Sequence, residues 1–253
     1  MRRRRWVGLV LITPFAFVMV APFLYMALRS LGEPNYKAAF DAWPFPRFLV
    51  NSLVLAGGAA VAQVLTSATA AYAFSRLRFP GRDRVFVAFL AMLIMPAVVL
   101  LVPRFLMVDA VGLVDSYAGL LSTELVSVWG IFFLRQYFLT LPRDLEDAAR
   151  LDGAGEWTIF WRVMLPLAKP GLVTLGLLAF VNQWKSFLWP LIATRSLDMQ
   201  VLEVALARFH GLYWSNEPVQ MAAAVMTTLP LLIVFLVAQR YVIRGVPLSA
   251  SRS

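Results

Sequence analysis

Long apolar runs separated by short polar segments form the dominant pattern along this chain. Four runs contain no charged residue, and two more are interrupted by isolated charges. Each is long enough for a helix that crosses a bilayer, which takes about 20 residues. Helices are expected rather than open strands, because lipid offers no hydrogen-bond partner to a bare backbone. The six predicted membrane-spanning helices cover residues 6–28, 48–75, 85–103, 116–134, 165–193 and 218–239.

The composition agrees with a membrane protein of a single domain over residues 1–253. Hydrophobic residues make up 60% of the chain and charged residues 15%, against about 25% charged in soluble domains. The run at 48–75 is rich in Gly, Ala and Ser, so we expect it to lie centrally, where helix backbones approach closely. The fold class predicted is therefore an all-α integral membrane bundle.

The basic residues predict the orientation of this bundle. Most of the 23 Lys and Arg residues lie at the two termini or after the second and fourth predicted helices. The positive-inside rule then places both termini in the cytoplasm. Arginines before an apolar run also resemble a signal peptide, but this run is too long and no small-residue cleavage site follows it. An uncleaved first span is expected instead.

A polar segment at residues 142–166 separates the fourth and fifth predicted helices. It opens with a proline, which suits the first turn of a helix, and Asp144, Glu146 and Asp147 then place negative charge near the helix's positive end. Gly153 suits a left-handed stop. The sequence therefore predicts a short acidic helix between residue 142 and this glycine.

Two faces of this segment are apolar. One face of the acidic helix carries Leu145, Ala148 and Ala149, and its small residues would let another protein's groove close around it. After the helix, apolar residues at helical spacing predict an amphipathic helix on the inner membrane surface: Trp157, Phe160, Trp161, Met164 and Leu165. The periodicity alone equally allows a solvated loop helix followed by an interfacial anchor.

The same segment resembles the EAA loop of ABC importer permeases. That motif is Glu-Ala-Ala, three residues, Gly, nine residues, an aliphatic residue, one residue and Leu-Pro. Every spacing is kept here, in the residues Asp147, Ala148, Ala149, Gly153, Val163, Leu165 and Pro166. Aspartate stands where the family usually has glutamate, which shortens the carboxylate by one methylene beside Glu146.

The resemblance extends over about residues 48–245, to the second permease subunit of the maltose and glycerol-3-phosphate branch of carbohydrate importers. It is carried by phrases such as Ala-Tyr-Ala-Phe-Ser-Arg-Leu at 71–77 and Trp-Lys-Ser-Phe-Leu-Trp-Pro-Leu at 184–191. Two departures are visible. Lys185 stands where the branch often has asparagine, and the tail lacks the usual Gly-rich, Lys-Gly ending.

The resemblance implies a six-helix type I importer permease in a bacterial inner membrane. A homologous second permease, two cytoplasmic ABC ATPase subunits and an extracytoplasmic solute-binding protein would be its partners, besides the bilayer; no nucleic acid is implied. ATP and Mg²⁺ would bind the ATPase subunits, and this chain would bind no cofactor. The solute would be a sugar or a glycerol-phosphate-type molecule. ATPase coupling is assigned by the motif, with the adjoining acid, to Glu146, Asp147, Ala148, Ala149, Gly153, Leu165 and Pro166.

Two charged residues inside predicted spans point to a transport path. A charge at the bilayer centre costs about 2.5–3.5 kcal/mol on insertion scales, so such residues usually face a cavity or a partner. We predict that an aromatic ring stacks on a sugar there while polar groups bind hydroxyls or a phosphate. The predicted path residues are Glu124, Asn182, Gln183, Trp184 and Lys185. Alternatively, Lys185 reaches the outer headgroups or pairs with Glu124.

Other function classes lack their signatures in the sequence. The absence of cysteine and the lone His210 exclude a cysteine-based or histidine-cluster metal site. No phosphate-binding loop, zinc motif or Gly-x-Ser-x-Gly elbow occurs, so ATP hydrolysis is expected on another chain. A self-contained secondary transporter would need paired intramembrane carboxylates in two repeats. A passive channel would leave the acidic segment unexplained.

Overall fold

The computed structural model describes residues 2–32, 34–212 and 216–245, and the side chains of 13–32, 34–208 and 216–239. All regular elements in these ranges are helical. In chain order they are α1 (Arg2–Ser30), α2 (Asn35–Asp41), α3 (Phe45–Arg76), α4 (Arg82–Ala91), η1 (Met92–Ile94), α5 (Leu101–Ala110), α6 (Tyr117–Ser122), α7 (Val128–Thr140), α8 (Asp144–Leu151), α9 (Glu156–Ile159), η2 (Phe160–Met164), α10 (Leu165–Leu167), α11 (Lys169–Trp184), α12 (Leu188–Ala193), η3 (Leu197–Met199), α13 (Leu202–Leu212) and α14 (Glu217–Gly245).

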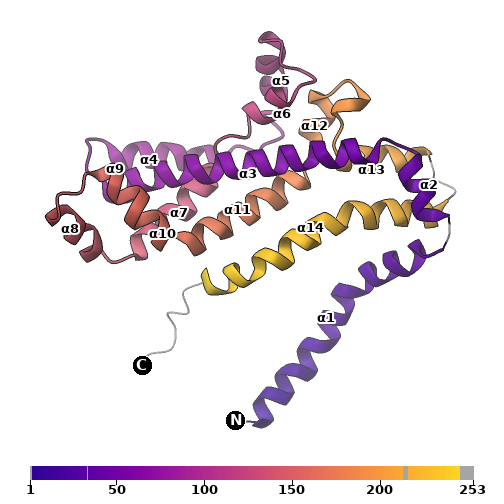
Figure 1. Ribbon diagram of the computed structural model, residues 1–253, viewed down its shortest axis with the longest axis horizontal. Helices are drawn as coiled ribbons and strands as arrows, with labels where there is room; N and C mark the ends of the chain where they lie inside the picture. Colours follow the sequence, from indigo (N-terminus) through magenta and orange to yellow (C-terminus); the bar gives the residue numbers. More distant parts are fainter. Residues whose placement is uncertain (1, 33, 213–215, 246–253) are drawn as a thin grey trace.

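The long helix α3 is the centre of the bundle. It packs along both α7 and α11, and α11 in turn packs on α14 (Figure 1). Small buried residues on α3 allow these close approaches, among them Ala56, Ala59, Ala68 and Ala71. The predicted central position of this helix is confirmed.

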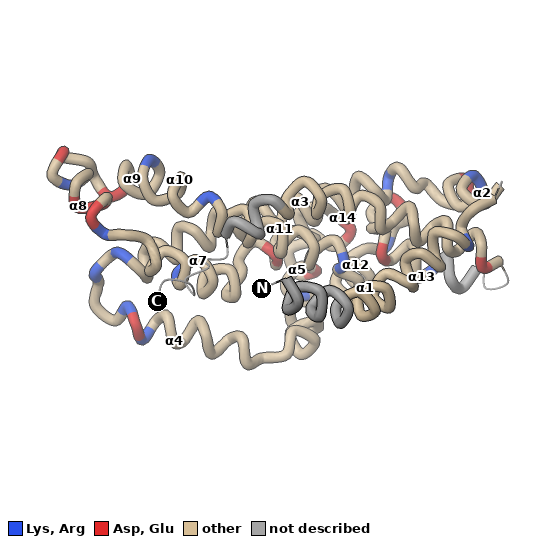
Figure 2. Tube along the Cα trace, turned by 90° about the horizontal axis from the view of Figure 1, so that it is seen from below, with Lys and Arg blue, Asp and Glu red and all other residues tan. Residues whose placement is uncertain are grey.

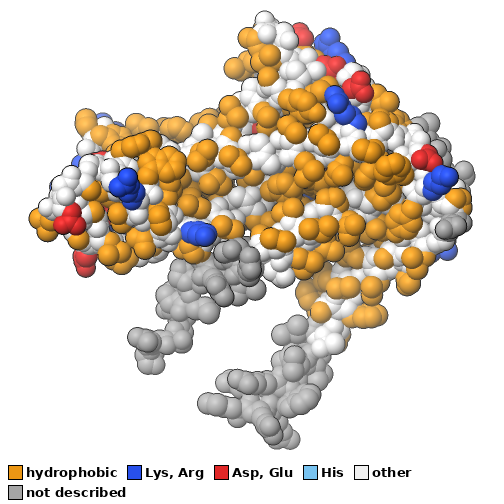
Figure 3. Space-filling model, in the orientation of Figure 1, with side chains coloured by type: hydrophobic (Ala, Val, Ile, Leu, Met, Phe, Trp, Pro, Cys, Tyr) orange, Lys and Arg blue, Asp and Glu red, His pale blue; other side chains and the backbone are white. Residues whose placement is uncertain are grey.

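The two ends of the bundle differ in what they carry. The end of α3 and the end of α7 meet α8 and α9, whereas α2, α12 and α13 lie toward the opposite end (Figure 1). Charged residues gather around α8, α9 and the start of α4 (Figure 2). Hydrophobic side chains cover the face over the middle of the bundle (Figure 3). This banding is typical of a protein that lies in a membrane.

Fewer continuous spans are present than the hydrophobic runs predicted. Three described helical stretches are long and apolar enough to cross a membrane: Thr13–Ser30, Phe45–Arg76 and Glu217–Gln239. A fourth crossing is a pair, Glu156–Leu167 and Lys169–Trp184, bent by 77°. The expectation of one continuous helix is wrong for residues 85–103, 116–134 and 165–193.

Local chemistry explains these breaks. Met95 precedes a proline and is extended, with ψ 121°, because the proline ring clashes with a helical residue before it. Ser127 is also extended, and its side chain accepts a hydrogen bond from the amide of Gly130, which starts a new helix after the break. Apolar composition alone contains neither signal.

Candidate coupling and translocation sites

The acidic helix α8 begins and ends close to where the sequence predicted. It covers Asp144–Leu151, with three acids in its first turn. Gly153 follows with φ +81°, so the predicted left-handed stop is confirmed. The helix begins two residues later than expected, with Arg143 at the N-cap position.

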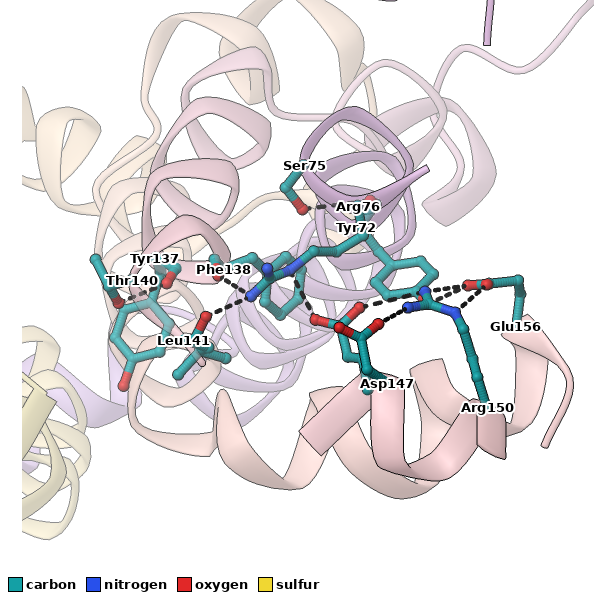
Figure 4. A network of polar contacts seen from close by, with 11 residues as sticks. Tyr72, Ser75, Arg76, Tyr137, Phe138, Thr140, Leu141, Asp147, Arg150 and Glu156 are labelled. Carbon is teal, nitrogen blue, oxygen red and sulfur yellow. Dashed lines mark hydrogen bonds and ion pairs between the residues drawn. The ribbon is translucent and has the colours of Figure 1, made fainter. Parts of the chain in front are cut away.

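A buried ion pair joins α8 to the end of α3. Arg76 Nε lies 2.9 Å from Glu146 Oε1, and both side chains are only 2% exposed. The Arg76 guanidinium also donates to the carbonyl oxygens of Phe138 and Leu141, at 2.5 and 2.8 Å (Figure 4). Burial raises the pKa of Glu146, and the charges of Arg76 and Arg150 oppose this rise. One arginine thus connects the end of α3 to α8 and to the end of α7, both of which lie far from α3 in the sequence.

A second set of contacts joins α8 to α9. Arg150 bonds Asp147 and Glu156, at 2.8 and 2.9 Å, and lies 3.6 Å from Glu146. The Tyr72 hydroxyl on α3 donates to Glu156 at 2.6 Å (Figure 4). The segment is therefore fixed to the bundle at both of its helices.

The outward side of α8 is acidic and apolar. The Asp147 side chain is 65% exposed, and Leu145 and Leu151 are 46% and 89% exposed. Ala148 is exposed, whereas Ala149 packs against the core beneath. The expectation that both alanines form one open face is therefore wrong: the helix presents Ala148 outward and uses Ala149 for docking. Glu146 likewise faces inward.

The segment after Gly155 is only partly as predicted. Trp157 and Trp161 are 66% and 45% exposed, but Phe160 and Met164 are buried in the protein core. The expectation of one apolar face on the membrane surface is wrong, because a π-helical turn over Phe160–Met164 changes the spacing. Leu165 packs partly against the same core, and Pro166 is exposed just before the bend into α11.

The break between α6 and α7 is bonded to α3. Three α3 side chains, those of Gln63, Thr66 and Ser67, donate to backbone carbonyls at 2.8, 2.9 and 3.4 Å. The acceptors belong to Glu124, Leu125 and Ser127. Non-helical backbone inside a membrane bundle is tolerated where protein groups form hydrogen bonds with its free carbonyls, as these three side chains do.

Glu124 lies in this break and is neutralised within the bundle. Its carboxylate pairs with Arg104 on α5 and accepts from the Gln183 amide on α11. Arg104 also lies over the Trp189 ring, 4.5 Å from its centroid. The alternative that Lys185 pairs with Glu124 is wrong. The sequence did not predict that Arg104, which directly follows the apolar run at 85–103, pairs with Glu124. No spacing rule links two residues that lie in separate elements.

Four of the five predicted path residues line one cavity of about 470 Å³, namely Glu124, Asn182, Gln183 and Lys185. Trp184 does not. Its side chain is 3% exposed, its ring stacks on Phe180, and its indole N–H donates to the Thr227 carbonyl at 3.3 Å. Successive helical residues project about 100° apart, so Trp184 points toward α14 and cannot stack on a solute here.

Residues 63–247, which contain both sites, match the family described as binding-protein-dependent transport system inner membrane component. The chain belongs to this family. It is the permease of a binding-protein-dependent importer, a membrane transport subunit rather than an enzyme.

Curated relatives of this importer permease have related names. It is 38% identical over 218 residues to the arabinooligosaccharides transport system permease protein AraQ of Bacillus subtilis (strain 168), covering 86% of this chain and 78% of AraQ. It is 35% identical over 209 residues to the sn-glycerol-3-phosphate transport system permease protein UgpE of Yersinia pestis, covering 81% and 74%. The diacetylchitobiose uptake system permease protein NgcG of Streptomyces coelicolor is 30% identical over 251 residues, covering 92% and 82%.

Solved structures agree on the fold of this permease. The crystal structure of a bacterial ABC transporter involved in the import of the acidic polysaccharide alginate matches with a TM-score of 0.79 and 26% identity, covering 95% of this chain and 96% of that one. The crystal structure of a bacterial alginate ABC transporter in complex with an alginate pentasaccharide-bound periplasmic protein matches with a TM-score of 0.73, covering 96% of each chain; at 18% identity, this match shows the fold alone.

Proposed function

We propose that this permease imports a sugar or a sugar-like, glycerol-phosphate-type solute, driven by two cytoplasmic ATPase subunits that contact α8. A homologous second permease completes the path, and an extracytoplasmic binding protein delivers the solute. The chain crosses a bacterial inner membrane six times, with some crossings made of broken helices, and both termini are cytoplasmic. ATP and Mg²⁺ bind the ATPase subunits.

The buried ion pair between Arg76 and Glu146 is the observation that carries this proposal. Burying a charged side chain is costly unless a partner compensates for its lost hydration. A helix with no role beyond joining two spans would not need such a buried pair. Here the pair ties α8 to the central helix α3, while Asp147 and Leu151 remain outward. A push on the outward side of α8 would therefore reach α3 directly.

The solute class is supported by the relatives and by the cavity. The relatives' names refer to arabinooligosaccharides, glycerol 3-phosphate and diacetylchitobiose. The cavity next to the α6–α7 break combines amide groups with Lys185, which suits hydroxyl-rich or anionic molecules.

Reversing the charge of Asp147 tests the coupling role. Asp147→Lys is expected to abolish solute uptake and the ATPase activity that the loaded binding protein stimulates, because an exposed cation would repel a basic ATPase surface. Copurification of the wild-type chain with an ATPase subunit and a second permease is expected as well. The measurement is uptake and ATPase activity of the importer in proteoliposomes.

Asp147→Glu is the matched control, since it restores the residue that the motif usually has, and it should keep full activity. Wild-type uptake by Asp147→Lys would refute the assignment of α8 as the coupling element.

A further inference from the structure

A second hollow adjoins the cavity of the proposed path. Its volume is about 320 Å³, and its lining includes Gln63 on α3, Trp129 on α7 and Asn182 on α11. It shares Leu178 and Asn182 with the cavity that contains Lys185. Together they form a cleft between three helices that lie side by side (Figure 1). Each part has the size of a small-molecule site, which starts at about 300 Å³.

Trp129 supplies this cleft with an accessible aromatic ring. The residue lies in the first turn of α7 and is 43% exposed. One face of its ring is stacked on Phe133, with centroids 5.4 Å apart and planes at 7°. A flat apolar group in the cleft can therefore stack on the opposite face. The C–H groups of a sugar ring form such a surface.

The polar groups around Trp129 are available to a ligand. Gln63 Nε2 donates a hydrogen bond to the Glu124 carbonyl, and no donor among the described residues bonds to Gln63 Oε1. Asn182 is exposed, and its side chain makes no hydrogen bond within the described part of the chain. Lys185 forms no ion pair with a described carboxylate; its charge opposes the rise that burial causes in the pKa of Glu203 on α13.

Exposing the polar side chains of Gln63, Asn182 and Lys185 to lipid would be energetically unfavourable. An unsatisfied amide or ammonium at membrane depth is unfavourable unless it meets water, a ligand or a partner. The Glu124 carboxylate is already paired with Arg104, so Lys185 is the charged side chain of the cleft lining that has no ion-pair partner among the described residues. A ligand with hydroxyl groups, one apolar face and a negative charge matches this arrangement.

We propose that the cleft holds one sugar ring of the solute during passage, and that it prefers a ring with an acidic group. The ring stacks on Trp129, its hydroxyls bond Gln63 and Asn182, and its acidic group lies near Lys185. This inference rests on the proposed function and deepens it. It gives Trp129 the stacking role that the buried Trp184 cannot fill.

Glycoside binding to the assembled importer in nanodiscs tests the proposal. Saturation-transfer NMR would use methyl glucoside, methyl arabinoside and methyl glucuronide at millimolar concentration. The wild type should bind the glucuronide best. Trp129→Ala should weaken binding roughly 3- to 10-fold, the value of an aromatic stacking contact, and Trp129→Phe should restore most of it. Lys185→Gln should remove the preference for the glucuronide.

Phe235→Ala is the matched control, because Phe235 is an exposed aromatic residue on α14 outside the cleft. Equal binding by the wild type and Trp129→Ala overturns the subsite, and so does absence of binding by the wild type. If the Trp129→Ala variant no longer copurified with the second permease, the cleft would be a subunit interface, and this result would also overturn the proposal. Loss of uptake in Asp147→Lys together with full activity in Asp147→Glu would show that the proposed function survives such a failure.

Discussion

Replacing Glu146 with alanine is expected to abolish solute uptake, an effect as large as that of the charge reversal at Asp147. The change leaves the Arg76 guanidinium buried without a counter-charge, and breaking a buried pair in this way costs about 3–5 kcal/mol. Helix α8 would then detach from α3, although its outward residues are unchanged. Uptake and ATPase activity in proteoliposomes measure the loss.

A double-mutant cycle separates this effect from general misfolding. Arg76→Met combined with Glu146→Met removes both charges and should recover assembly with the ATPase subunits better than either single change, because no unpaired charge stays buried. Additive losses in the cycle, or wild-type uptake by Glu146→Ala, would contradict a coupling role for the pair.

Gly119→Ala is expected to cause the largest loss of stability. A Cβ atom at this position in α6 would lie 2.0 Å from the Leu113 carbonyl oxygen. That atom belongs to the backbone and cannot rotate away, so α6 must shift. Overpacking typically costs about 1–3 kcal/mol and occasionally more. The measurement is thermal unfolding of the purified permease in detergent.

Gly57→Ala is the matched control for this prediction. The position lies in α3, and an added Cβ meets nothing within 4 Å. Alanine is also favoured over glycine in a helix by about 1 kcal/mol. The control should therefore unfold at or above the wild-type temperature. A Gly119→Ala protein as stable as the wild type would show that α6 is not held against Leu113.

The sequence predicted well those features that depend on local chemistry. The charge at the start of α8, its glycine stop and the small-residue face of α3 each follow from a rule about neighbouring residues, and each is confirmed. The path residues Asn182 and Lys185 were found because polar groups are rare in apolar runs. The structure brings both to one cavity.

The features that were missed depend on contacts between distant segments. Arg104 and Glu124 pair across separate elements, and Arg76 meets Glu146 over a distance of 70 positions in the sequence. The direction of Trp184 depends on the rotation of α11 about its axis, which a uniformly apolar helix does not reveal. Ala149 and Phe160 were predicted to face outward, but both pack inward. Which side of a short helix meets the bundle depends on residues that are distant in the sequence.

Sided labelling of single cysteines tests the central claim most directly. The chain has no cysteine, so Leu151→Cys on α8 and Arg195→Cys near the opposite end each introduce a single thiol; the native side chains are 89% exposed at Leu151 and 69% at Arg195. A membrane-impermeant maleimide should label Leu151→Cys only in inside-out vesicles and Arg195→Cys only in right-side-out vesicles. Leu151→Cys should also cross-link to an ATPase subunit. Labelling of Leu151→Cys from the outside would contradict the account, because no cytoplasmic ATPase could then reach α8.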